Sequence, residues 1–168
     1  MKKILLSLLV VGVGVFVTSC GKDDEEKKSN YVIHDGVEYE LSTSSAEIYD
    51  YGCGTTHCNY DFYFYGIGET YVEVYVELYE ESTSGFSGGN FSNGLDSQDV
   101  SYWDDDYVQI GDVYNYAASG SVKATPLSGT NEWKIDFNYT DGNGKSYKGN
   151  YTGELTLYDN SNARSVKD

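Results

Sequence analysis

The chain has 168 residues and a formal net charge of −16 at pH 7, which excludes nucleic acid as a partner because phosphate binding depends on a basic surface. The same charge argues against peripheral binding to anionic lipid. The 18 tyrosines and 19 glycines, with one proline, are typical of an all-β protein, and the length suffices for one domain with a hydrophobic core.

A lipoprotein signal peptide is predicted over residues 1–19. Lys2 and Lys3 precede an apolar run over residues 4–17, which is shorter than the roughly 20 residues that a membrane-spanning helix needs. The sequence Val17-Thr18-Ser19-Cys20 that follows resembles the lipobox of bacterial lipoproteins. The resemblance implies that Cys20 receives a diacylglycerol, becomes the first residue of the mature chain and is then acylated on its amine. An ordinary secretory signal followed by an unrelated cysteine is the alternative.

Residues 20–30 are predicted to be the lipidated cysteine and an acidic, flexible tether, since residues 21–30 contain no apolar side chain. The acidic cluster at residues 23–26 resembles the surface-export signal of outer-membrane lipoproteins of the Bacteroidota. This resemblance implies an outer-membrane protein that is anchored by lipid and exposed at the cell surface. A spacer that is merely soluble is the alternative.

An antiparallel β domain is expected over residues 31–160, followed by a disordered tail over residues 161–168. The dipeptide Asp35-Gly36 between alternating apolar residues predicts a hairpin that pairs His34 with Val37 and Val32 with Tyr39. In this hairpin Val37 is expected on the inner face. A further short strand is expected over residues 46–51.

The clearest strand pair covers residues 60–65 and 71–79. Even-numbered positions there are apolar or aromatic and should face the core, whereas odd-numbered positions carry tyrosine or acidic side chains. The outward tyrosines form a possible ligand face for a glycan or a protein, because tyrosine combines a flat apolar ring with a polar tip. Cross-strand tyrosines that only stabilise the sheet are the alternative. The residues of this candidate face are Tyr63, Tyr65, Tyr71, Tyr75 and Tyr79.

The second half of the domain is less regular. Short strands are expected around Phe91 and Val100, interrupted by an acidic run at residues 104–106, and further strands over residues 108–116 and 120–125. In the last hairpin, the apolar residues have odd numbers on both strands. They can share one face only if the turn has an odd number of residues, and the predicted register pairs Phe137 with Tyr147. Two glycines on the inner face of one strand, Gly149 and Gly153, indicate a sharp bend or a bulky neighbour lying over the backbone. About ten strands therefore predict one antiparallel β-sandwich or a curved, β-barrel-like domain.

Two clusters could in principle bind a metal ion. With Cys20 assigned to lipid, Cys53 and Cys58 form an even pair in an exported protein and predict a disulfide, although together with His57 they could supply three zinc ligands. The run Asp104, Asp105 and Asp106 could gather calcium, but its spacing fits no familiar calcium loop, and a solvated acidic loop is expected. No metal or other cofactor is predicted.

The order of motifs over nearly the whole mature chain resembles a group of uncharacterised outer-membrane lipoproteins of the Bacteroidota. The matching segments are residues 34–41, 71–78, 87–91, 120–124, 133–137, 141–145 and 148–155. These segments hold mostly turn and core residues, so the resemblance implies a fold and no activity.

Function is predicted by elimination. The sequence contains no phosphate-loop or His-Glu-x-x-His motif, so an enzyme is not expected. The prediction is a non-enzymatic, lipid-anchored surface module that binds an unknown protein or glycan. The alternatives are an envelope lipoprotein that contacts other proteins without a ligand pocket, and a lipocalin-like carrier of small molecules.

Overall fold

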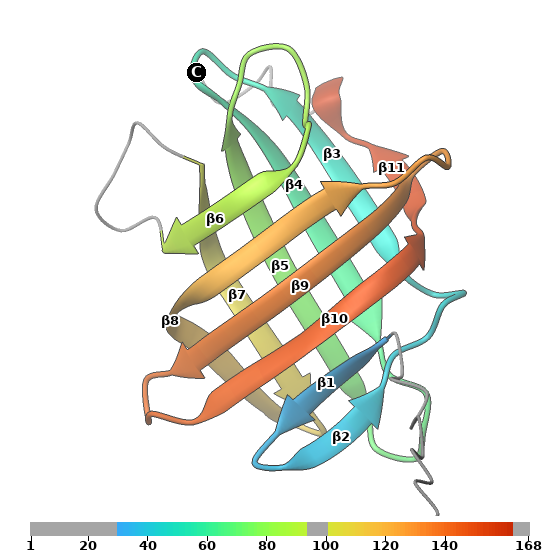
Figure 1. Ribbon diagram of the computed structural model, residues 1–168, viewed down its shortest axis with the longest axis vertical. Helices are drawn as coiled ribbons and strands as arrows, with labels where there is room; N and C mark the ends of the chain where they lie inside the picture. Colours follow the sequence, from blue (N-terminus) through green and yellow to red (C-terminus); the bar gives the residue numbers. More distant parts are fainter. Residues whose placement is uncertain (1–29, 94–100, 163–168) are drawn as a thin grey trace, which may run out of the picture.

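The computed structural model describes residues 30–93 and 101–162, which form one curled sheet of 11 strands (Figure 1). The strands follow the spatial order β11-β3-β4-β5-β7-β6-β8-β9-β10-β1-β2. Within these two ranges no helix is long and apolar enough to cross a membrane. The strands are β1 (Tyr31–His34), β2 (Val37–Glu40), β3 (Glu47–Cys53), β4 (His57–Tyr65), β5 (Val72–Glu81), β6 (Gly89–Asn93), β7 (Tyr102–Ile110), β8 (Val113–Pro126), β9 (Glu132–Asp141), β10 (Ser146–Glu154) and β11 (Thr156–Asp159).

The sheet curls because the long strand β8 belongs to both of its halves. The first part of β8 pairs with β7, and the second part pairs with β6 and β9. As a result β9, β10, β1 and β2 cross over β3, β4, β5 and β7 and enclose the core between the two halves (Figure 1). A single bridge between Leu41 and Gly66 joins the chain beyond β2 to the chain beyond β4. The predicted all-β, barrel-like domain is thus confirmed as a half-barrel.

Two pairings are parallel, so the sheet is mixed and not wholly antiparallel as predicted. Strand β6 runs parallel to β7, and β11 runs parallel to β3. The pairing of β11 with β3 arises because the chain passes from the end of β10 to the free edge of β3. There the amide of Thr156 donates a 2.9 Å hydrogen bond to the carbonyl oxygen of Ala46. Buried Leu155 fixes this crossing point. Of the tail predicted over residues 161–168, only Ser161 and Asn162 lie in the described ranges.

The core lies where the alternation of β4 and β5 places it. All the even-numbered residues of these strands are buried, as the sequence predicts, and Phe62, Phe64 and Val76 are fully enclosed. Strands β7, β9 and β10 contribute large aromatic side chains to the same core. The largest of these are Trp103, Tyr139, Tyr147 and Tyr151, each almost completely buried.

The predicted first hairpin is confirmed in register, with His34 opposite Val37 and Val32 opposite Tyr39. The assignment of its inner face is only partly correct. Val32 is fully buried, but Val37 is 52% exposed, because β2 is the edge strand and its first residue extends beyond the core.

The region around the acidic run was predicted wrongly. Strand β7 continues through the acidic run and contains a β-bulge there. Asp104 pairs with Glu77 and Tyr107 with Tyr75, so the two residues between Asp104 and Tyr107 lie opposite the single residue between Tyr75 and Glu77. The predicted strand over residues 108–116 is instead a hairpin, in which Ile110 pairs with Val113 across a two-residue turn. The expected strand around Val100 lies outside the described residues.

The last hairpin has the predicted parity but a register shifted by two residues. Tyr147 pairs with Tyr139 instead of Phe137, and the turn holds five residues. The Asp141 carboxylate explains the wider turn, because it accepts hydrogen bonds of 2.8 Å from the amides of both Asn143 and Lys145.

Candidate functional site

The outer face of β3, β4, β5 and β7 carries a continuous row of tyrosines, called here the tyrosine row. Tyr63, Tyr75, Tyr107 and Tyr116 lie directly opposite one another on four neighbouring strands. Their successive ring centroids are 4.8, 5.1 and 5.7 Å apart, close to the spacing of the strands themselves. The row continues from Tyr63 across β3 to β11 through Tyr49 and Tyr158.

The other half of the sheet packs on the opposite, inner side of these strands, so no strand of the described ranges covers the row (Figure 1). Its members are therefore partly exposed and not buried. Exposure is greatest at the end of the row on β8, where Tyr114 is 50% exposed and Tyr116 is 57% exposed. This surface is available to a ligand.

The rings of the row partly cover one another. The planes of Tyr63 and Tyr75 are inclined by 43°, those of Tyr75 and Tyr107 by 31°, and those of Tyr49 and Tyr158 by 17°. Central rings therefore use much of their flat faces on their neighbours. Such contacts stabilise a sheet by about 0.2–1 kcal/mol per pair, so the row also has a structural role.

Carboxylates lie between the tyrosines and accept hydrogen bonds from their hydroxyl groups. Glu47 accepts hydrogen bonds from Tyr49 at 3.1 Å and from Tyr65 at 3.2 Å. Glu73 accepts hydrogen bonds from both Tyr71 and Tyr107. Burial raises the pKa of the Tyr49, Tyr65 and Tyr107 phenols, and the neighbouring carboxylates act in the same direction.

Glu77 is the most enclosed glutamate on the row. It accepts hydrogen bonds from the Tyr79 hydroxyl at 2.7 Å and from the Asn59 amide at 3.1 Å. Burial raises the pKa of the Glu77 carboxyl, and the negative charges of Asp104 and Asp105 act in the same direction. At Tyr71 the hydrogen bond to Glu73 is the largest cause that raises the pKa of the phenol, to about 12.

The five tyrosines predicted as a ligand face do not all belong to one row. Tyr63 and Tyr75 lie in it, while Tyr65 and Tyr71 are attached to it through the glutamates. Tyr79 instead stacks on Tyr102 at a centroid distance of 4.7 Å, in a second and shorter row. The tyrosines that the sequence did not identify come from strands whose register it left open. They are Tyr49, Tyr107, Tyr116 and Tyr158.

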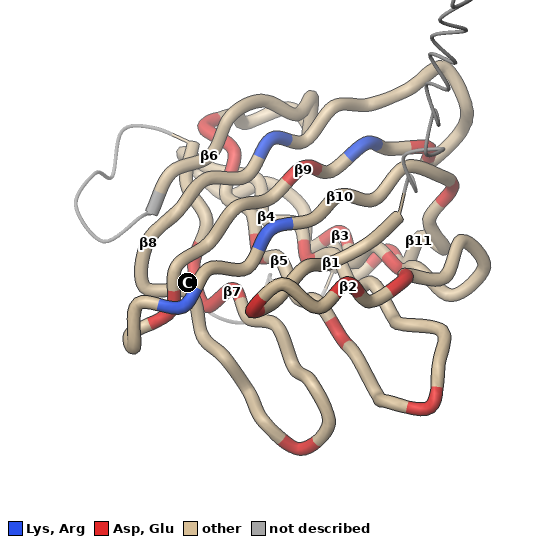
Figure 2. The backbone as a smooth tube through the Cα atoms, turned by 60° about the horizontal axis from the view of Figure 1, so that its bottom comes forward, with Lys and Arg blue, Asp and Glu red and all other residues tan. Residues whose placement is uncertain are grey.

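Positive charge is confined to the other half of the sheet. The sequence contains no lysine or arginine from residue 29 to residue 122. The lysines of the described ranges lie on β8, β9 and β10 or in the turn before β10, as Figure 2 shows in blue. They are Lys123, Lys134, Lys145 and Lys148. No described lysine or arginine therefore belongs to β3, β4, β5 or β7.

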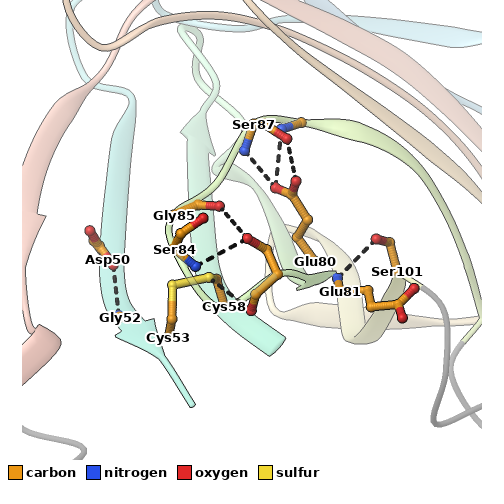
Figure 3. The surroundings of a disulfide bond; sticks show 12 residues. Asp50, Gly52, Cys53, Cys58, Glu80, Glu81, Ser84, Gly85, Ser87 and Ser101 are labelled. Carbon is orange, nitrogen blue, oxygen red and sulfur yellow. Dashed lines mark hydrogen bonds between the residues drawn. A yellow bond between two sulfur atoms is a disulfide. The ribbon is translucent and has the colours of Figure 1, made fainter. Parts of the chain in front are cut away.

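The predicted disulfide is confirmed. Cys53 and Cys58 face each other across β3 and β4 and are joined through their sulfur atoms, closing the hairpin (Figure 3). The hairpin turn is also held by the Gly54 amide, which donates a 2.8 Å hydrogen bond to the carbonyl oxygen of His57. Since the sulfurs are bonded to each other, they do not act as zinc ligands. In the two described ranges, no three histidine, cysteine or acidic side chains are grouped so that they could bind a metal ion.

Buried Glu80 organises the loop next to the disulfide (Figure 3). Its carboxylate accepts hydrogen bonds from the amide and hydroxyl of Ser87 and, at 3.1 Å, from the amide of Gly88. The chain between β5 and β6 is thereby tied to the end of β5.

Removing the disulfide should cost little. Replacing Cys53 and Cys58 together with serine is expected to lower the free energy of unfolding by about 2 kcal/mol, the loop-closure value for so small a ring. Urea denaturation would measure the change. The reduced wild-type protein is the control and should lose the same amount; equal stability of the oxidised and reduced forms would contradict the expectation.

The three aspartates of the acidic run lie in different environments. Asp104 and Asp105 are exposed, as predicted, but Asp106 is 0% exposed, so the expected solvated loop is wrong for this residue. The bulge turns the Asp106 side chain into the core, where its carboxylate accepts hydrogen bonds from the Glu77 amide at 2.6 Å and from the Tyr139 hydroxyl. Burial raises the pKa of the Asp106 carboxyl. These contacts give Asp106 a structural role.

Cys20 and the tether lie outside the described residues. Comparison of the chain with family models, with curated proteins and with solved structures finds no match.

Proposed function

We propose that this chain is a non-enzymatic binding module, anchored in the outer membrane through a lipid on Cys20 and exposed at the cell surface. Residues 21–30 would act as the tether between the anchor and the β domain. The resemblance of Val17-Thr18-Ser19-Cys20 to a lipobox supports the anchor, and the acidic residues that follow support export. The proposal includes membership of the lipoprotein group of the Bacteroidota that the motifs resemble.

The observation that carries the binding role is the tyrosine row with its interleaved carboxylates. It spans six strands of an uncovered face, and tyrosine is enriched where proteins bind partners in the presence of water. The tightly packed aromatic core favours surface binding over the alternative of an internal carrier.

The anchor is tested by replacing Cys20 with serine in the full-length protein. The variant should appear in the soluble fraction, because serine cannot receive the thioether-linked diacylglycerol on which stable anchoring depends. The double serine variant at Cys53 and Cys58 is the matched control and should remain with the membranes. Fractionation followed by immunoblotting measures both, and membrane retention of the Cys20→Ser variant would contradict the proposal.

A further inference from the structure

We propose that the tyrosine row and its carboxylates bind an extended, cationic polypeptide segment that is rich in lysine or arginine. This inference rests on the proposed function, since it names the ligand class of the same face. It depends on three properties of that face: the sign of its charge, the packing of its rings and the net charge of the whole molecule.

The charge of the face is uniformly negative. Glu73 and Glu77 lie on either side of Tyr75 on β5. Glu47 lies on β3, and Asp104 on β7 lies opposite Glu77 in the strand register. The hydrogen bonds that these glutamates accept come from phenols and an amide, which are neutral and leave the charge uncompensated. A cationic ligand would supply the compensation, and an anionic ligand would be repelled.

The packing of the rings favours a cation over a neutral sugar. A sugar stacks on an open aromatic face, but the central rings, Tyr63, Tyr75 and Tyr107, partly cover one another. Beside these rings lie the carboxylate oxygens of Glu73 and Glu77. An ammonium or guanidinium group forms charge-assisted hydrogen bonds with such oxygens and gains further attraction from neighbouring aromatic rings.

The occupant is a different molecule and not a second copy of this chain. The described part of a copy could offer four lysines, of which Lys134 is already paired with Asp136 at 3.2 Å and Lys145 with Asp35 at 2.9 Å. The net charge of −16 also makes copies repel one another. The row crosses one strand about every 4.8 Å, so an extended segment lying along it would meet a tyrosine at each strand.

The test uses the full-length, lipid-anchored protein in nanodiscs of neutral phosphatidylcholine. The probes are fluorescent decapeptides of alternating arginine and serine or of alternating glutamate and serine, followed by fluorescence anisotropy. The arginine peptide should bind, with an affinity that falls as salt is added, and the glutamate peptide should not bind. Replacing Glu73 and Glu77 together with glutamine should weaken binding about fivefold, the expectation for losing two partly exposed ion pairs.

The matched control removes the same charge from another place. Glutamine at both Glu38 and Glu40, on the opposite edge strand β2, should change the affinity less than twofold. At position 73 the glutamine carbonyl oxygen can accept from one tyrosine hydroxyl and its NH₂ group can donate to the oxygen of the other, so the face should remain folded, which circular dichroism would verify. Equal weakening by the two double variants would overturn the inference, because binding would then follow net charge alone.

Two other outcomes separate this inference from the proposed function. If the arginine peptide does not bind but neutral oligosaccharides shift the NMR signals of Tyr75 and Tyr107, the face is a glycan site; the cationic inference then fails and the binding module remains. If neither ligand class perturbs these tyrosines, both the inference and the proposed ligand face are overturned.

Discussion

Replacing Asp106 with alanine should lower the free energy of unfolding by about 3 kcal/mol at pH 7. The loss is expected because the substitution leaves two buried donors, the Glu77 amide and the Tyr139 hydroxyl, without their acceptor, and each such group costs about 1–3 kcal/mol. It also leaves a small cavity in the core beside Trp103, whose ring packs against that of Tyr139. Urea denaturation followed by circular dichroism would measure the loss.

Asparagine at the same position should behave in the opposite way. Its carbonyl oxygen can accept the hydrogen bond of the Glu77 amide, and its side-chain NH₂ can donate to the Tyr139 hydroxyl oxygen, so the core stays satisfied. Asparagine also avoids the cost of a buried ionisable group. The Asp106→Asn variant is therefore expected to be at least as stable as the wild type at pH 7.

The pH dependence distinguishes these effects. Burial raises the pKa of Asp106 above the value of 3.8 of the unfolded chain, so in the interval between the two values the folded protein holds a proton that the unfolded chain has released. The free energy of unfolding must therefore fall as pH rises from about 4 to the folded-state pKa. The difference in stability between Asp106→Asn and wild type should grow over that interval, and a difference that is constant with pH would contradict the assignment.

Replacing Gly149 with alanine should destabilise the protein by about 2–3 kcal/mol, the cost of forcing extra volume into a packed core. A Cβ atom at this position would lie 2.1 Å from the carbonyl oxygen of Tyr31 and 2.6 Å from the ring of Phe137. The Tyr31 oxygen is a backbone atom of β1 and cannot move without disturbing the ladder with β10, while the Phe137 ring is packed in the core. Thermal and urea denaturation would detect the loss.

Gly142 provides the matched control for this substitution. It lies in the turn between β9 and β10, and a Cβ atom there would meet nothing within 4 Å. The Gly142→Ala variant should therefore change the free energy of unfolding by less than about 0.5 kcal/mol. If both alanine variants lose a similar free energy of unfolding, the close approach at Gly149 is not the cause of the loss at that position.

The sequence predicts the parts of this fold that depend on local pattern. The alternation along β4 and β5 identifies the buried set because successive side chains of a strand point to opposite faces. The hairpin at Asp35-Gly36 is predicted because two residues with positive φ determine its register. The close approach at Gly149 is likewise confirmed, since the ring of Phe137 lies against its backbone.

What could not be predicted depends on contacts between distant strands. The register of the last hairpin is set by the Asp141 carboxylate, which binds the backbone of a wider turn, and alternation restricts only the parity of that turn. The burial of Asp106 requires a bulge opposite β5, and the run of three aspartates gives no sign of which one turns inward. The parallel pairing of β11 with β3 joins segments that are far apart in the chain.

The candidate face was predicted in outline for the same reason. Tyr63 and Tyr75 are neighbours in one hairpin, so their common face follows from period-two alternation. The continuation to Tyr107 and Tyr158 depends on how β7 and β11 join the sheet, which the sequence leaves open. The repeated spacing of tyrosine and acid in β3, at Glu47 and Tyr49, is the local signal that could have extended the prediction.

The uneven placement of lysine and arginine also determines where a protease that cuts after these residues can cleave the chain. A protease of trypsin's specificity cuts only after these residues and needs a stretch of backbone that can enter its cleft, and no bond from residue 29 to residue 122 offers such a side chain. Lys123, Lys134 and Lys148 lie inside strands whose backbone is already paired on both sides. Lys22, Lys27 and Lys28 lie between Cys20 and the first strand, so under the proposed lipid anchoring, cleavage there would release the β domain with its tyrosine row.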